Sequence, residues 1–454
     1  MKNWQNKRGL FLTAIATGTM LNPLNSSMIS LALHSIQKDF QLSFTTVSWL
    51  ISSFYLASAI GQPVTGKLGD LIGRKRMFLI GLVLVAVSAF GAPLAPTFSI
   101  LLIMRLIQSV GSSAVYPSGI GLVRTHIQEK QASALAVLSI FSSAMAALGP
   151  TVGGFLIVWG GWPSIFLVNF PFIFLSFVLG WYVLPKDSKE SKMKLKALIK
   201  QMDVMGILLF AVGMILLLWF LLSFKTTPHY VSGIFGLLFL GAFVWRELKA
   251  STPFIDIRLF KSHPTLTWVY LQFILLNLFN YCLFFGLPTY FQDEMHFSVK
   301  ETGIIMLFMS GISIVFSPIS AKWVDKSGTR QPIVFGSFLM LIGAVLLTIF
   351  FIHVPLIIMC LILMLIGISY GIGNVALQVA MLDASPTNIV GTSSGLFQTC
   401  RYLGSILSSV VLGLVFGEEI TPGHFEILGS VMIAVSIISV LMNMKSSKAA
   451  SLKE

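Results

Sequence analysis

The sequence predicts an all-α protein that crosses a membrane fourteen times. Three observations lead to this prediction: the composition, the length of the apolar runs, and the placement of the basic residues. The 454 residues are 56% hydrophobic and 10% charged, whereas an ordinary soluble domain carries about 25% charged residues. A water-soluble fold is excluded because so few polar residues cannot cover the surface of a protein of this length.

The apolar runs determine the number of crossings. The hydrocarbon core of a bilayer is about 30 Å thick and needs about 20 apolar residues in a helix, whereas a barrel strand needs about ten residues of alternating polarity. Every run in this chain is long and continuously apolar, so each one predicts a helix. The first run follows a basic start without a small-residue cleavage site, so we expect a retained helix. The fourteen predicted helices cover residues 9–33, 46–66, 77–96, 98–121, 131–157, 163–184, 204–224, 230–248, 265–290, 302–322, 331–351, 354–380, 389–416 and 425–444.

The basic residues predict the orientation in the membrane. Of the 30 Lys and Arg residues, 25 lie in segments on the same side as the N-terminus, three lie on the other side, and Arg105 and Arg401 lie inside predicted helices. Both termini are predicted to be cytoplasmic because cytoplasmic segments are enriched in Lys and Arg. The formal charge of +13 therefore reflects topology, and no nucleic-acid partner is expected. The six lysines of residues 186–200 fit a solvated connector, with contact to anionic lipid headgroups as the alternative.

No residue pattern predicts catalysis or a cofactor. The three cysteines, Cys282, Cys360 and Cys400, lie inside apolar runs without metal-ligand spacing, which is typical of packing residues. The stretch "GISYG" at 367–371 matches a hydrolase motif, but it lies inside an apolar run with no strand-to-helix turn. We therefore expect neither an enzyme nor a metal site.

An offset of 255 residues relates two parts of the chain. It aligns "GKLGDLIGRKR" at 66–76 with "AKWVDKSGTRQ" at 321–331. Each stretch follows the second helix of a set of six, so the repeat predicts six helices, two inserted helices and six further helices. The predicted divisions are an N-terminal bundle at 1–185, a basic loop with the inserted helices at 186–262, and a C-terminal bundle with a short tail at 263–454. The matched pairs are Lys67 with Lys322, Asp70 with Asp325, and Gly73 with Gly328.

Three motifs resemble those of the major facilitator superfamily, and within it the fourteen-helix drug:proton antiporter family. "GKLGDLIGRKR" is similar to the signature G-x-L-x-D-r-x-G-r-r between helices two and three, and "RLIQSVGSS" is similar to R-x-x-q-G-x-G in helix four. "LGPTVGG" is similar to G-P-x-x-G-G, the signature of exporters in helix five, and "FPFIF" and "TPFIDIRLF" extend the resemblance over nearly the whole chain. The residues that match the second and third motifs are Arg105, Gln108, Gly149, Pro150, Gly153 and Gly154, with Ser109 in place of a usual glycine.

This resemblance implies a secondary active multidrug exporter of the bacterial plasma membrane. Such a protein moves amphiphilic compounds by alternating access in exchange for protons, so its partners are these substrates, protons and membrane lipids. A monomer is expected. The alternatives are a lipid or lipid-precursor flippase of the same fold, an uptake symporter, which the exporter motif disfavours, and a membrane scaffold without turnover.

The loop signature also has a physical interpretation. Its glycines allow a tight turn between two helices, and Asp70 can meet a neighbouring helix N-terminus or a basic side chain across the bundle interface. Such a contact would hold one access state, whereas the alternative is a solvated loop that only sets topology. The candidate gating residues are Gly66, Asp70, Gly73, Arg74, Lys75 and Asp325.

Two arginines are predicted to lie within the membrane. Arg105 is seven residues into its predicted helix, which corresponds to a depth of about 10 Å at 1.5 Å per residue. A charge there costs about 2.5–3.5 kcal/mol, so the side chain should face the bundle interior. The resemblance implies that Arg105, with Gln108, acts in proton transfer or substrate contact, and the alternative is an arginine that reaches the headgroups. Arg401 should pair with carbonyls or with polar side chains such as Gln378 and Gln398, or line the cavity.

The exporter motif combines small residues with a proline. Gly149 and Gly153 form a face that permits close helix approach. Pro150 removes a backbone hydrogen bond and bends a helix. The pattern fits either a gate hinge or plain packing.

The first predicted helix departs from the family pattern. The family carries an aspartate there, implied in proton coupling and in recognition of cationic drugs, whereas "LNSSMISLALHSI" places Asn25 at that position. Every acidic residue lies in a loop or near a helix end, so the best coupling candidates are Asp39, Asp293 and Glu294, just beyond helices one and nine. The alternative for these three is solvated loop charge. With two buried arginines and no buried carboxylate, we expect zwitterionic, anionic or neutral amphiphiles to be preferred over dications.

Overall fold

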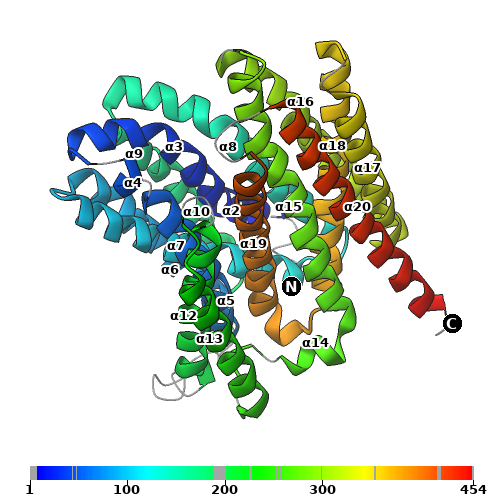
Figure 1. The fold of residues 1–454 in the computed structure, drawn as a ribbon. Helices are drawn as coiled ribbons and strands as arrows, with labels where there is room; N and C mark the ends of the chain where they lie inside the picture. Colours follow the sequence, from blue (N-terminus) through cyan, green and yellow to red (C-terminus); the bar gives the residue numbers. More distant parts are fainter. Residues whose placement is uncertain are drawn as a thin grey trace. The chain divides into compact units, whose positions relative to one another are not determined.

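The predicted helices are present in the computed structural model (Figure 1). All regular structure in the described residues is helical, and each of the fourteen predicted segments lies on helix there. Ten helices in the described part are long and apolar enough to cross a membrane, so the chain is a multi-pass membrane protein. Fourteen crossings and cytoplasmic termini stay predictions. The structure describes residues 8–42, 44–47, 49–187, 201–223, 227–251, 253–255, 257–297, 299–351, 354–416 and 421–451.

The first predicted helix, 9–33, is wrong in two respects. It consists of two helices separated at Met20, and the second continues to Asp39. The break has a local cause, since Pro23 has no N–H to donate to Thr19 and its ring clashes with that carbonyl. The helices of this part of the chain are α2 (Arg8–Thr19), α3 (Leu21–Asp39), α4 (Phe44–Val47), α5 (Trp49–Ile72), α6 (Arg74–Gly91), η1 (Ala92–Leu94), α7 (Phe98–His126), α8 (Gln131–Gly160), α9 (Ser164–Leu167) and α10 (Asn169–Val183).

The two inserted helices and the last six predicted helices follow after the basic loop, whose residues 188–200 lie outside the described part. Their bounds agree with the predicted runs, with extensions of up to several residues beyond the apolar edges. The helices are α12 (Val204–Ser223), α13 (Tyr230–Lys249), α14 (Arg258–Ser262), α15 (Pro264–Asp293), α16 (Val299–Ser327), α17 (Arg330–Ile349), α18 (Leu356–Ala384), η4 (Thr387–Ile389), α19 (Val390–Phe416) and α20 (Pro422–Ser451).

The helix boundaries follow the sequence repeat. The offset of 255 residues moves Ile72, the end of α5, onto Ser327, the end of α16. Gly73 and Gly328 come next, and both have a positive φ, of 109° and 78°. Neighbouring helices also correspond, because α6 packs on α7 and α10 as α17 packs on α18 and α20. In sequence, two sets of helices with these corresponding contacts therefore precede and follow α12 and α13.

Contacts between Cα atoms divide the chain into two compact units. Unit 1 comprises Met1–Leu208, Lys249–Ile255 and Ser385–Thr399, and unit 2 comprises the remaining residues. The segment after α13 and the first turns of α19 thus pack with the N-terminal helices. The predicted division at 185 and 262 stays a prediction.

The inserted helices α12 and α13 lie side by side, and most of their residues, Leu209–Leu248, belong to unit 2 (Figure 1). A Cβ on Gly236 of α13 would lie 2.8 Å from the backbone nitrogen of Leu217 in α12, so the two helices approach closely. Leu237 and Trp245 on α13 are 64% and 62% exposed. Apolar side chains on the outside of a membrane helix are solvated by lipid, so this exposure fits a hairpin of two membrane helices.

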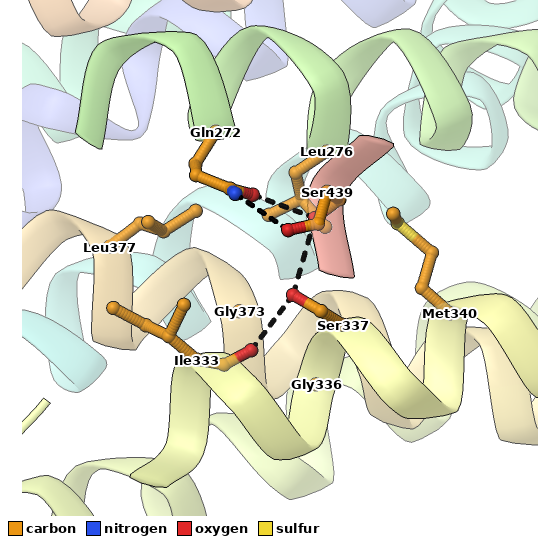
Figure 2. A pocket seen from close by; sticks show the side chains of 9 residues that line it. All are labelled: Gln272, Leu276, Ile333, Gly336, Ser337, Met340, Gly373, Leu377 and Ser439. Carbon is orange, nitrogen blue, oxygen red and sulfur yellow. Dashed lines mark hydrogen bonds between the residues drawn. The ribbon is translucent and has the colours of Figure 1, made fainter. Parts of the chain in front are cut away.

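The C-terminal set encloses a small cavity of about 10 Å³, which is mostly apolar and has three polar side chains in its lining (Figure 2). Gln272 of α15 donates a hydrogen bond of 2.9 Å to the carbonyl of Ser439 in α20, and the Ser439 hydroxyl donates one of 2.7 Å to Gln272 Oε1. Ser337 of α17 lies 3.2 Å from the Ser439 hydroxyl. A cavity of this size holds about one water molecule. It therefore serves the packing of the bundle and is too small for a substrate.

Candidate functional site

The turn between α5 and α6 is shorter than predicted. Gly66 and Gly69 lie inside α5, and only Gly73 lies between the two helices, so the prediction that the signature glycines form the turn is wrong for Gly66 and Gly69. Gly73 has a φ of 109°, and a Cβ on it would lie 2.3 Å from the carboxylate carbon of Asp187. Both the backbone angle and this close approach require glycine here.

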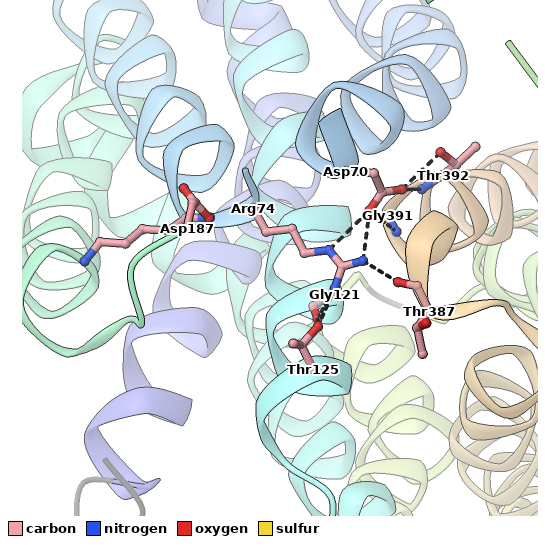
Figure 3. Close-up of polar contacts among 9 residues, drawn as sticks. Asp70, Arg74, Gly121, Thr125, Asp187, Thr387, Gly391 and Thr392 are labelled. Carbon is pink, nitrogen blue, oxygen red and sulfur yellow. Dashed lines mark hydrogen bonds and ion pairs between the residues drawn. The ribbon is translucent and has the colours of Figure 1, made fainter. Parts of the chain in front are cut away.

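Asp70 binds the first turn of α19 (Figure 3). Its carboxylate accepts hydrogen bonds from the backbone nitrogens of Gly391 at 3.0 Å and Thr392 at 2.9 Å, and from the Thr392 hydroxyl at 3.2 Å. Its side chain is 5% exposed. The first N–H groups of a helix have no partner within the helix and carry a partial positive charge. A carboxylate at this position accepts their hydrogen bonds and interacts favourably with that charge.

Arg74, the first residue of α6, completes this contact (Figure 3). Its guanidinium forms an ion pair of 3.0 Å with Asp70 and donates to the carbonyls of Thr387 and Gly121, each at 2.9 Å. It also donates to the Thr125 hydroxyl. One side chain thus joins α6, α7 and the segment that leads into α19. We call Asp70, Arg74, Gly391 and Thr392 the latch.

A close backbone approach supports the latch. A Cβ on Gly66 would lie 2.2 Å from the carbonyl oxygen of Gly391, so α5 and α19 touch through their main chains. Further along the same two helices, Thr399 donates a hydrogen bond of 2.8 Å to the carbonyl of Ala59. Residues 390–399 therefore lie along α5 over more than two turns.

Two further contacts, made by residues outside the predicted gating set, hold the signature in place. Asp187, just after α10, accepts hydrogen bonds of 3.0 Å from the backbone nitrogens of Lys75 and Arg76. Lys67 donates to the carbonyl of Pro253, in the segment after α13. Sequence reasoning missed Asp187, because a single acid beside a run of lysines carries no signal in its spacing.

Arg105 is fixed within unit 1 by a set of acceptors. It is 1% exposed. Its guanidinium donates to Gln108 Oε1, to the carbonyl of Asn25 at 3.0 Å and to that of Leu50 at 3.5 Å. It also lies 4.1 Å from the ring centroid of Phe54, which is a cation–π distance. The charge therefore joins α3, α5 and α7 without reaching the protein surface.

Asn25 forms a reciprocal amide pair. Its side-chain nitrogen donates to Asn169 Oδ1 at 2.9 Å, and the Asn169 nitrogen donates back at 2.8 Å. Asn25 also donates to the carbonyl of Leu21 at 2.7 Å. The two asparagines are 3% and 0% exposed. An ionised aspartate could only accept, whereas the amide supplies both the donor and the acceptor of this pair, so the departure from aspartate has a structural reason.

We expect the Asn25→Asp variant to be less stable than the wild type. An ionised carboxylate cannot donate, so Asn169 Oδ1 and the Leu21 carbonyl each lose their donor, at a cost of about 1–3 kcal/mol per buried oxygen. Protonation of the new carboxylate restores one donor. The melting temperature of the detergent-solubilised variant should therefore be lowered at pH 8 and partly recovered at pH 5. Half-buried Asn22, which donates to Ser112, offers the matched Asn22→Asp control. Equal melting of the two variants at pH 8 would contradict the pair.

The exporter motif lies on α8 against α3. A Cβ on Gly149 would lie 2.8 Å from Ser27 Cβ, and Gly153 faces the same helix, whereas Gly154 faces open space. The helix continues as α8 through Pro150, whose side chain lies outside the described part. Close packing thus accounts for two of the four residues, and the hinge at Pro150 stays a prediction.

The three candidate coupling acids lie at helix ends. The prediction placed Asp39 and Asp293 just beyond their helices. Instead they are the last residues of α3 and α15, because both helices extend past their apolar runs. Asp39 is exposed and accepts a hydrogen bond of 2.7 Å from the indole of Trp162. Glu294 is half-buried at the end of α15, and the side chain of Asp293 lies outside the described part.

In unit 2, Arg401 is partly buried on α19. Its guanidinium donates a hydrogen bond of 3.2 Å to Asn374 Oδ1 on α18 and lies 5.7 Å from the ring centroid of Phe273. Asp325 is exposed in the last turn of α16. The acid that the repeat pairs with Asp70 therefore has a different environment, and the two copies of the signature are not equivalent.

Comparison with protein families decides the family. A sequence model described as Major Facilitator Superfamily matches residues 15–409. The chain belongs to the major facilitator superfamily. This confirms the predicted superfamily, whose members are transport proteins and not enzymes, while the fourteen-helix drug:proton antiporter family stays a prediction.

Individual superfamily members add detail. The protein is 70% identical over 438 residues to the uncharacterized MFS-type transporter YwoD of Bacillus subtilis (strain 168), which covers 96% of this chain and 97% of that one. It is 27% identical to the tetracenomycin C resistance and export protein of Streptomyces glaucescens, over 90% of this chain and 76% of the relative. The fold is similar to that of the proton:xylose symporter XylE, with a TM-score of 0.69 at 15% identity over 97% of this chain and 96% of the other.

Proposed function

We propose that this transporter is a secondary active exporter of amphiphilic small molecules, which works by alternating access in the cell membrane and exchanges its substrate for protons. The latch is the observation that carries the proposal. A carboxylate that binds the N-terminus of a distant helix can hold one access state and must release it to reach the other. A relative named as a resistance and export protein supports the direction of transport.

The strength of the latch suits a reversible switch. Hydrogen bonds to a charged group contribute about 1.5–3 kcal/mol each, and Asp70 accepts three from α19 besides its ion pair with Arg74. Two states that differ by a few kcal/mol can be exchanged by a ligand that binds one of them more tightly. With cytoplasmic termini, the turn between α5 and α6 would lie on the cytoplasmic side, and the closed latch would shut that entrance.

The charges within the helices favour a substrate class. Arg105 and Arg401 lie in membrane helices, and the amide pair of Asn25 and Asn169 supplies no negative charge. Cationic groups attract carboxylates and repel cations. Zwitterionic, anionic and neutral amphiphiles are therefore the proposed substrates, and dications are disfavoured.

Proton coupling is proposed to use Asp39, Asp293 and Glu294. Because Asn25 does not titrate, we assign proton binding to these acids at the ends of α3 and α15. Neutralising all three, with two Asp→Asn changes and Glu294→Gln, should abolish gradient-driven efflux and leave equilibrium binding of a fluorescent substrate unchanged. The exposed acid Glu129 offers a matched Glu129→Gln control. Undiminished gradient-driven efflux in the triple variant would remove these acids from the mechanism.

Transport by purified protein in proteoliposomes tests the function. The vesicles carry an imposed pH gradient, and the probes are norfloxacin as a zwitterion, ethidium as a cation and a fluorescent phospholipid. We expect movement of norfloxacin that stops when an ionophore dissipates the gradient. Movement that ignores the gradient would contradict proton exchange, and phospholipid scrambling without drug movement would identify a flippase instead.

A further inference from the structure

The signature segment 66–76 contacts the chain on both sides of the inserted helices. Asp187 lies before α12, and Pro253 lies after α13, yet both belong to unit 1 with the signature. Asp187 binds the start of α6, and Pro253 binds Lys67 in α5. The turn that carries the latch is therefore held at two points. The contact on the α6 side joins residues more than 100 positions apart in the sequence, and the contact on the α5 side joins residues more than 180 apart.

Asp187 acts as an N-terminal cap for α6. Its two carboxylate oxygens each accept one backbone N–H, from Lys75 and from Arg76, at 3.0 Å. The residue directly before the helix is Gly73, which has no side chain to cap it. The Lys75 side chain in turn donates to the carbonyls of Trp181 and Leu184 at the end of α10, at 2.6 and 2.7 Å. The start of α6 and the end of α10 thus satisfy each other's unpaired backbone groups.

This cap sets the position of Arg74. Arg74 is the residue before the two capped nitrogens, and its guanidinium reaches Asp70, α7 and the carbonyl of Thr387. Because these partners lie at hydrogen-bond distances from the guanidinium, a shift of the first turn of α6 would break the hydrogen bonds of Arg74. Asp187 itself makes no contact with Asp70 or with α19 among the hydrogen bonds of the described residues.

Lys67 provides the second point of attachment. Its ammonium group donates to the carbonyl of Pro253 and lies 5.9 Å from the ring centroid of Phe254. Phe254 and Ile255 are 2% and 5% exposed, so the segment after α13 is buried against unit 1. The α5 side of the turn is thereby attached to the segment after α13, as Asp187 attaches the α6 side to the segment before α12.

We propose that Asp187 is a positioning residue of the latch: it caps α6, places Arg74 against Asp70, and so keeps the Asp70 carboxylate on the N-terminus of α19. The proposal deepens the proposed function and rests on it for its role in transport. The cap itself is testable without any substrate, because Gly391 and Thr392 donate their backbone N–H groups to Asp70.

Hydrogen–deuterium exchange of the full-length protein in detergent gives the test. With Asp187→Ala, exchange of the amides in peptide 385–399 should accelerate about three- to tenfold, as expected for weakened hydrogen bonds to a charged group. Peptides of α17 in unit 2 should exchange as in the wild type. Asp187→Glu, which can still accept both N–H groups, should restore most of the protection. Glu129→Gln removes the same charge from an exposed site and should leave all peptides unchanged.

The outcomes separate positioning from plain stabilisation. Faster exchange throughout the protein would mean that Asp187 only stabilises the fold, and faster exchange confined to α6 would mean that the latch does not depend on the cap. Either result overturns the proposal. In proteoliposomes, Asp187→Ala should lower the maximal rate and leave the KM for norfloxacin unchanged. If wild-type protein moves no substrate while peptide 385–399 responds as expected, the proposed function fails and the positioning role stands.

Discussion

Replacing Asp70 by asparagine should lower the maximal transport rate by about tenfold or more, because hydrogen bonds to a charged group contribute about 1.5–3 kcal/mol. The amide keeps the shape of the side chain but loses its charge and one acceptor oxygen. Arg74 then lacks its ion-pair partner, and the N–H groups of Gly391 and Thr392 lose a carboxylate. The state in which α19 is held should become less populated, which deuterium exchange of peptide 385–399 measures directly.

The repeat supplies a matched control for this variant. Asp325 occupies the corresponding position of the second signature, but it is exposed, whereas the Asp70 side chain is 5% exposed. Asp325→Asn should therefore change transport much less than Asp70→Asn. Equal losses in the two variants would show that the signature acid works through its local helix, and the latch would not be the cause.

The second large effect is expected at Arg105. Arg105→Lys should reduce transport by about tenfold or more at equal amounts of folded protein, because one ammonium cannot reach acceptors placed around a planar guanidinium. The acceptors lie on three helices and include the carbonyls of Asn25 and Leu50. Each buried acceptor left without a donor costs about 1–3 kcal/mol, so the melting temperature should also fall.

Arg124→Lys is the matched control, since Arg124 lies on the same helix α7 and is half-buried at its far end. It should retain transport and stability close to the wild type. Arg105→Leu removes the charge and every donor to these acceptors, so it should be less stable than the wild type, and its transport is compared at equal amounts of folded protein. A folded Arg105→Leu protein that transports at the wild-type rate would exclude Arg105 from the transport cycle.

The sequence was most informative where lipid imposes the structure. Backbone groups in a bilayer must be satisfied within the helix, so every long apolar run had to be helical, and the ends of α5 and α16 follow the same 255-residue repeat. It was least accurate where polar residues lie next to an apolar run. The signature around Gly66 is helix and not loop, and α3 runs on to Asp39, because a helix can continue into the headgroup region with polar residues.

The site divides in the same way. The signature alone indicated that Asp70 meets a helix N-terminus or a basic side chain, since an acid with glycines at that spacing is unnecessary for topology. It could not indicate which helix, because the nitrogens of Gly391 and Thr392 are 321 and 322 residues away in the sequence. The absence of a helix-one aspartate was visible at Asn25, but its partner Asn169, 144 residues later, was not identified as such.

The sequence by itself determined that this protein is a multi-pass helical transporter with two related sets of helices and a similar turn after the second helix of each set. In the part of the chain that the structure describes, the tertiary structure buries the acid of the first turn in the latch and leaves the acid of the second turn exposed, and it brings Asp187 and the Pro253 carbonyl onto the first turn. The physical reason is range. Transfer into lipid acts on each run of residues separately and can be read along the chain, whereas a hydrogen bond needs two groups whose separation in sequence carries no periodic signal.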